Sequence, residues 1–157
     1  MKSQTKYVKK LNRRRVLICM ILFFALLPVF SYLHEGGHAL VCIADGNEAE
    51  ISVNFSGGTT LCHGDVSNLF AYKISGGLFA GIIGTIGGIA LFRWKIPFIA
   101  ITTIGIGHLV NAGIETFADS YFTHGVEWSF FLGLVEFVTF FILLLIFDRK
   151  TVNRGMK

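Results

Sequence analysis

The chain has 157 residues, of which 53% are hydrophobic and 15% charged, and its mean hydropathy is +0.63. This composition is too apolar for an ordinary soluble protein of this length and predicts one membrane-embedded domain over residues 1–157. The net charge of +4 does not indicate a nucleic-acid partner, because seven of the fourteen Lys and Arg residues lie in the first fifteen positions and four more follow the last apolar segment. Such basic flanks are typical of orientation signals beside a lipid bilayer.

Four apolar segments are long enough to cross the hydrocarbon core, which requires about 20 helical residues. They cover residues 16–41, 71–92, 96–118 and 128–147. We therefore predict an all-α integral membrane protein with about four transmembrane helices. The loop of residues 45–70 is the exception, because its alternating pattern predicts a small β-hairpin with strands at 51–55 and 59–62 around a Ser-Gly-Gly turn at 56–58.

The charges also predict an orientation. The short loop between the second and third spans carries Arg93 and Lys95, whereas residues 45–65 contain four acidic residues and no Lys or Arg. By the positive-inside rule, both termini are expected in the cytoplasm and the hairpin on the outer side. The first span is expected to be retained, because it is longer than the apolar region of a usual signal peptide and no small-x-small cleavage site follows before His34.

The first span ends in the motif His34-Glu35-Gly36-Gly37-His38. On a helix, two histidines four positions apart share a face and can bind one zinc ion, while the glutamate between them can act as a general base on water. Polar residues at the end of an apolar span are costly, so they mark a functional site. The alternative is a hydrogen-bonded His-Glu cluster without metal. We expect the two glycines to keep this helix narrow, so that the hairpin can approach it.

Cysteines and glycines predict further contacts. Cys42 and Cys62 flank the outer loop, and the sequence leaves open whether they form a disulfide or remain two free thiols. Cys19, inside the first span, is expected to be a small buried hydrophobic residue. The second span contains Gly-x-x-x-Gly patterns at 77–81 and 84–88, which predict close packing against another helix.

A catalytic zinc usually has three protein ligands, so one must come from another segment. The third span carries a polar stripe within about 80° of one helix face, formed by His108, Asn111, Glu115 and Asp119. At about 1.5 Å of rise per residue, Asp119 lies nearest the depth of His34 and is therefore the first choice for the third ligand. Glu115 is the alternative ligand. In that case Asp119 would be an interfacial carboxylate.

Three other histidines are expected to lie away from the metal. His108 is predicted to be too deep to reach it and to pair instead with Glu136 of the fourth span. His63 and His124 fall in outer loops, where a solvated side chain is expected.

Residues 33–40, Leu-His-Glu-Gly-Gly-His-Ala-Leu, together with the Asn111 to Asp119 stretch, resemble the site-2 protease family of intramembrane zinc metalloproteases. The resemblance implies His34, His38 and Asp119 as ligands of one zinc ion. It also implies Glu35 as the base and Asn111 as a group that polarises the substrate carbonyl. The eight-residue spacing of Asn111 and Asp119 matches the family's second motif, whereas the family's proline, leucine and glycine are absent from it here.

The expected function is therefore that of a zinc metalloprotease that hydrolyses peptide bonds in or near transmembrane segments of membrane-protein or peptide substrates, with its active site toward the outer face. Two other functions are compatible with the sequence. One is a non-proteolytic metal-binding membrane protein of the same fold, and the other is a small helical membrane adaptor whose glycine faces bind partner helices.

Overall fold

The computed structural model describes residues 12–54, 57–118 and 125–152, with side chains in the last stretch described for 127–147. In chain order the elements are α1 (Arg13–Ala44), β1 (Glu48–Asn54), β2 (Gly57–His63), α2 (Leu69–Ala90), α3 (Lys95–Phe117) and α4 (Gly125–Val152). All four helices are long and apolar enough to cross a membrane, which suggests a multi-pass membrane protein. Each predicted span coincides with one helix, and the predicted hairpin coincides with β1 and β2.

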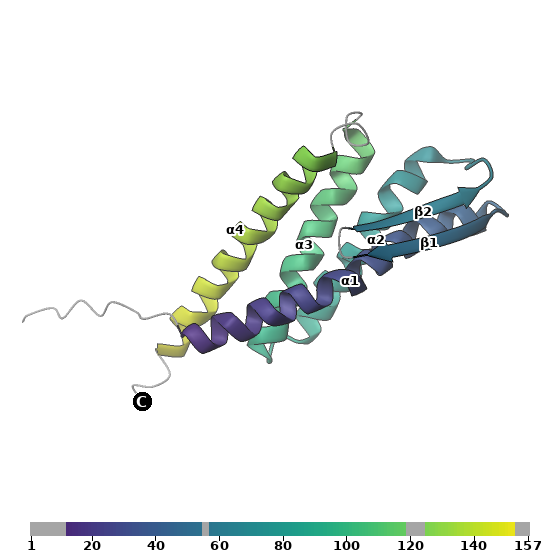
Figure 1. Cartoon of the computed structure of the whole chain (residues 1–157). Coiled ribbons are helices and arrows are strands. Elements are labelled where there is room, and N and C mark those ends of the chain that lie inside the picture. The colour runs from purple at the N-terminus through teal and green to yellow at the C-terminus, as the bar shows by residue number, and fades with distance from the viewer. Residues whose placement is uncertain (1–11, 55–56, 119–124, 153–157) are drawn as a thin grey trace, which may run out of the picture.

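The helices are not parallel. Figure 1 shows that α1 and α4 lie close together at the end that holds the start of α1 and the end of α4, and diverge toward the other end. The helix α3 packs against both α1 and α4, and α2 packs against α1 and α3. The hairpin lies along the second half of α1, on the side away from α4 (Figure 1).

The glycines of α2 allow this helix to approach α3 closely. A Cβ atom at Gly77 would overlap the backbone of α3 at Ala112, and one at Gly84 would overlap the backbone of Gly105. Only hydrogen at these positions lets the two backbones meet. The packing predicted from the Gly-x-x-x-Gly patterns is therefore confirmed.

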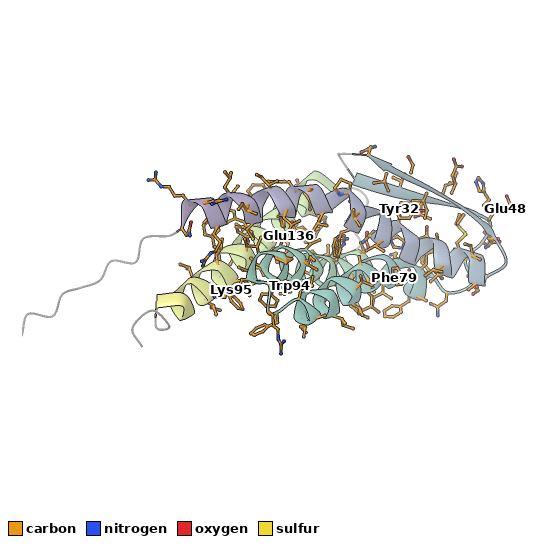
Figure 2. The ribbon with its side chains drawn as sticks, turned by 90° about the horizontal axis from the view of Figure 1, so that it is seen from below. Tyr32, Glu48, Phe79, Trp94, Lys95 and Glu136 are labelled. Carbon is orange, nitrogen blue, oxygen red and sulfur yellow. A yellow bond between two sulfur atoms is a disulfide. The ribbon has the colours of Figure 1, made fainter. Side chains whose placement is uncertain are left out.

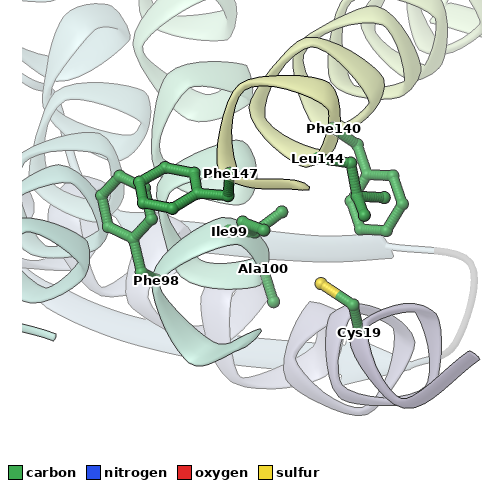
Figure 3. Close-up of a cluster of buried hydrophobic side chains, with 7 residues drawn as sticks. All are labelled: Cys19, Phe98, Ile99, Ala100, Phe140, Leu144 and Phe147. Atoms are coloured by element: carbon green, nitrogen blue, oxygen red, sulfur yellow. The ribbon is translucent and has the colours of Figure 1, made fainter. Parts of the chain in front are cut away.

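An apolar cluster fills the end of the molecule near the start of α1. It joins α1, α3 and α4 through buried side chains, shown in Figure 3, namely Cys19, Phe98, Ile99, Ala100, Phe140, Leu144 and Phe147. The ring centroids of Phe98 and Phe147 are 4.9 Å apart with an edge-to-face geometry, which is a favourable arrangement for aromatic pairs. Cys19 is thus a buried hydrophobic residue, as expected.

The hairpin is connected to α1 by a disulfide between Cys42 and Cys62, whose Cα atoms are 5.8 Å apart. Of the two outcomes that the sequence left open, the structure has the bonded one. The pairing of β1 and β2 differs from the prediction in one respect, because Asn54 pairs with Gly57 and the two glycines expected in the turn belong to β2. The reason lies at Gly58, where a Cβ atom would overlap the side chain of Glu35, so a glycine in the strand allows β2 to pack on α1.

The end of α1 is also held to the start of α2. The Ser67 hydroxyl donates to Asp45 Oδ1 over 2.6 Å, and the Ser67 backbone N–H donates to Asp45 Oδ2 over 2.9 Å. These hydrogen bonds lower the pKa of Asp45. One residue further on, the side chain of Asn68 caps α2 by accepting the N–H of Ala71. The first turn of α2 is therefore fixed beside the last turns of α1, where the histidine motif lies.

Candidate metal site

Three buried side chains from two helices meet at one point. His34 Nε2 lies 3.2 Å from His38 Nε2 and 3.3 Å from Glu115 Oε1, and His38 Nε2 lies 3.7 Å from Glu115 Oε2. These three residues could hold a metal ion. Ligands bound at 2.0–2.1 Å in a tetrahedron lie about 3.3–3.4 Å from one another, so the observed spacing fits a small tetrahedral ion.

The carboxylate of Glu115 gives a second reason to expect a cation. Glu115 is only 6% exposed, and its Oε2 atom accepts no hydrogen bond from any described residue. A buried carboxylate is costly unless it is paired with a positive charge or coordinates a metal. A metal ion held by His34, His38 and Glu115 would supply such a charge.

The backbone of α2 fixes the orientation of His38. The ring Nδ1 of His38 lies 2.7 Å from the carbonyl oxygen of Tyr72. A carbonyl can only accept, so Nδ1 carries the proton and Nε2 presents its lone pair to the site. The close fit requires Gly76, because a Cβ atom there would overlap the His38 ring.

His108 occupies the corresponding place behind His34. The two Nδ1 atoms are 3.3 Å apart, and the ring of His108 stacks on Phe30 with centroids 6.0 Å apart. For His34 to present Nε2 to a metal, its Nδ1 must carry the proton and donate it to His108 Nδ1. In that arrangement His108 would accept the Nδ1 proton of His34 and orient its ring.

This position corrects the expectation that His108 lies too deep and pairs with Glu136. Counting residues along each helix placed His34 closer to the outer membrane surface than His108. However, α1 is oblique to α3, so part of the length of α1 does not contribute to the depth of His34 along α3 (Figure 1). No hydrogen bond joins His108 to Glu136 in the described part of the chain, since Glu136 packs against Gly107 on an adjacent face of α3.

Glu35 lies on the hairpin side of α1. Its Oε2 atom accepts a hydrogen bond of 2.7 Å from the hydroxyl of Thr60 on β2, and the same hydroxyl lies 3.0 Å from the carbonyl oxygen of Glu35. Thr60 has one hydroxyl proton, and it is donated to the carboxylate in preference to the carbonyl, because a charge-assisted hydrogen bond is stronger than a neutral one. The hydroxyl of Tyr72 in turn donates to the carbonyl of Thr60, which links β2 to α2.

All of these groups line one cavity of about 480 Å³. Asn111 also lines it, is 7% exposed and has an Oδ1 atom without a hydrogen-bond partner among the described residues. The polar stripe predicted on the third span is thus confirmed for His108, Asn111 and Glu115. Gly57, Gly58 and Thr59 of β2 form the hairpin wall of the same cavity, and Ser129 brings α4 to its edge.

The remaining predicted residues fall elsewhere. Asp119, the first choice for third ligand, and His124 lie outside the described residues, and α3 ends at Phe117. Glu115, the alternative ligand, is the carboxylate that the structure groups with the histidines. His63 is half exposed at the end of β2, 3.8 Å from Glu50, and does not line the cavity.

The glycines of the motif act differently from the prediction. A Cβ atom at Gly37 would overlap the backbone of α2 at Ser75, whereas one at Gly36 would meet nothing within 4 Å. Gly37 therefore permits the approach of α2, not of the hairpin, because the hairpin packs on the neighbouring face that carries Glu35. The close approach of the strand depends on Gly58 instead.

Three contributing residues were not identified from the sequence, namely His108 as a partner of His34, Tyr72 as a partner of His38 and Thr60 as a partner of Glu35. The only available signal was the place of His108 on the polar stripe. The Tyr72 contact uses a backbone carbonyl, which any residue could supply, so the residue type carried no information.

The fold and the site together define a mostly helical chain of the multi-pass membrane type with a buried His-His-Glu group that could hold a metal ion. Comparisons of the chain with protein-family models, curated proteins and solved structures found no match.

Proposed function

We propose that this chain is a membrane-embedded zinc metalloprotease that hydrolyses peptide bonds in or near transmembrane segments of other proteins. The observation that carries the proposal is the placement of Glu35 beside three converging ligand atoms in one cavity. A histidine pair on one helix turn with a glutamate between them is an arrangement that zinc-dependent proteases use for hydrolysis. The resemblance of residues 33–40 to the site-2 protease family supports the same function.

In this proposal His34, His38 and Glu115 hold one zinc ion. The donor set of two imidazoles and one carboxylate is a common catalytic zinc set, and it leaves a fourth position open. When held by these three residues, zinc would supply Lewis acidity that polarises a substrate carbonyl and activates water near neutral pH.

The residues of the chain perform the proton transfer and hold the substrate. Glu35 accepts a proton from the attacking water and passes it to the departing amine, while Thr60 keeps the carboxylate aimed at the cavity. Asn111 lines the cavity, and its side-chain N–H group can donate to the substrate carbonyl as charge develops on it. One edge of β2 pairs with no described strand, so an unwound substrate segment can add to it beside the cavity.

The experiment that tests the function uses purified chain in detergent micelles with single-span test peptides. Wild type should hold about one zinc per chain by elemental mass spectrometry and should cleave a subset of the peptides. Glu35→Gln should retain the zinc and lose cleavage, because an amide cannot accept the proton. Glu127→Gln, an exposed acidic position on α4, is the matched control and should behave as wild type.

Each alternative function gives a different result. Zinc without cleavage in any variant would favour a non-proteolytic metal protein. Absence of zinc from wild type would favour the membrane adaptor. Cleavage by Glu35→Gln at the wild-type rate would contradict the mechanism.

The proposed orientation places both termini in the cytoplasm and the hairpin outside. Two independent features support it, the distribution of basic residues and the disulfide, because disulfides persist in oxidising compartments. An Asn54→Cys variant should react with a membrane-impermeant maleimide in intact cells, and a Thr151→Cys variant should not. The opposite labelling pattern would reverse the orientation.

A further inference from the structure

A second cavity, of about 330 Å³, lies between α1 and α4. Its walls are apolar and include Phe24 and Leu27 of α1 and Gly133, Phe137 and Phe140 of α4. We call this cavity the α1–α4 groove. Glu136 is the one ionisable side chain among the described residues that line it. Figure 2 shows this residue along the helices, far from the end of the hairpin at Glu48.

The packing of α3 makes room for Glu136. A Cβ atom at Gly107 would overlap the Glu136 carboxyl group, so this glycine lets the carboxyl lie against the α3 backbone. In the described part of the chain, no hydrogen bond or ion pair involves Glu136. A carboxyl group within a membrane span is costly without a partner and marks a functional position. The chemistry of the groove therefore calls for a partner with a hydrogen-bond donor or a positive charge.

The groove lies next to the metal site along α1 and α4. Leu27 in the groove is one turn from Ser31, and Gly133 is one turn from Ser129, and both serines line the cavity that holds the metal ligands. The two cavities thus follow the same pair of helices, which diverge toward the metal site (Figure 1). A helix lying in the groove would extend toward the metal site at one end.

We propose that the α1–α4 groove binds the transmembrane helix of the substrate and that Glu136 recognises a basic side chain, such as lysine, in that helix. This inference rests on the proposed function only in that the bound helix is taken to be the substrate. The apolar walls suit a membrane helix, and Gly133 lets it approach closely. Glu136 is seven residues from Ser129, about 10 Å along α4, so the basic residue lies about two helical turns from the bond that is cut.

The test measures binding separately from cleavage. Full-length Glu35→Gln carrying a photo-activated cross-linking amino acid at Phe137, which is 60% exposed in the groove, is reconstituted in phosphatidylcholine vesicles. The probes are two Leu-Ala single-span peptides that differ only in one central Lys or Leu. We expect about three- to tenfold more cross-linking to the Lys peptide, the range that polar contacts between membrane helices provide.

Variants at Glu136 and a second cross-linking position make the result specific. Glu136→Leu should abolish the preference for the Lys peptide, and Glu136→Lys should transfer it to a peptide with a central Glu. The same cross-linker at Phe130, which is 77% exposed on α4 and does not line the groove, should show no preference. Circular dichroism and thermal unfolding measured for each variant show whether the chain has folded.

Several outcomes would overturn the inference. Equal cross-linking of the Lys and Leu peptides, or an unchanged preference in Glu136→Leu, would remove the role of Glu136. Adducts formed mainly with lipid or with a second copy of the chain would assign the groove to that occupant. If Glu136-dependent binding is seen while wild type cleaves nothing, the groove proposal stands and the protease proposal fails.

Discussion

The two halves of α1 pack against the rest of the molecule by different physical means. The first half contributes Cys19 to a cluster of aromatic and aliphatic side chains from α3 and α4, where shape and dispersion provide the stabilisation. The second half contributes His34, Glu35 and His38, and each has a specific hydrogen-bond partner on another element. A close-packed apolar cluster responds to changes in volume, whereas the polar half should respond to the loss of single atoms.

The strongest test of this contrast pairs Glu115→Ala with Leu144→Ala. The first should weaken zinc binding more than about a hundredfold, because even a residue that only hydrogen-bonds to a metal ligand contributes roughly 10- to 100-fold to metal affinity. The second should reduce the free energy of unfolding by about 2–4 kcal/mol, through the cavity it creates, and leave the zinc content unchanged. Chelator competition and thermal unfolding in micelles measure the two effects. Zinc retained in Glu115→Ala but lost in Asp119→Ala would make Asp119 the third ligand.

Loss of the disulfide should loosen the polar half alone. The loop closed by Cys42 and Cys62 spans 20 residues, so the double Cys42→Ser/Cys62→Ser variant should lose roughly 3 kcal/mol of unfolding free energy. Thermal unfolding with and without reductant measures this loss, and reductant should have no further effect on the variant. Cys19→Ala is the control for a thiol in the apolar half, and its stability should not depend on reductant. An equal response of wild type in both buffers would contradict the prediction.

His108→Ala tests whether a residue that does not bind the metal fixes a ligand. We expect zinc affinity to fall about 10- to 100-fold, because His34 loses the acceptor for its Nδ1 proton. His108→Asn keeps an oxygen acceptor and should recover most of the affinity. Chelator competition provides the measurement, with Leu109→Ala as a control on a neighbouring face. If Asn and Ala behave alike, His108 acts only by filling space.

The smallest expected effect distinguishes the two glycines of the motif. Gly37→Ala should reduce the free energy of unfolding by about 1–3 kcal/mol, because the added methyl group overlaps the α2 backbone. Gly36→Ala meets nothing within 4 Å and should be neutral or slightly stabilising, by less than about 1 kcal/mol. Thermal unfolding of both variants in the same micelles measures the difference. Equal stability would mean that α2 can shift without cost.

The sequence by itself determined the spans, the hairpin and the histidine pair, because each depends on local periodicity or on spacing within one helix. Apolar runs of sufficient length specify helices, and two histidines four positions apart share a face whatever surrounds them. The Gly-x-x-x-Gly patterns also identified the α2 face that packs against α3. The polar stripe of α3 followed from the same helical geometry.

Only the tertiary structure showed that Glu115 meets the histidines, and where His108 and Glu136 lie. Those outcomes depend on how far α1 inclines to α3, and the inclination is set by backbone contacts at Gly37, Gly77 and Gly84 that residue counting does not describe. The partners of His38 and Glu35, the Tyr72 carbonyl and the Thr60 hydroxyl, depend on the same packing. Spacing along one helix is fixed by the chain, whereas depth between two helices is fixed by how closely their surfaces fit.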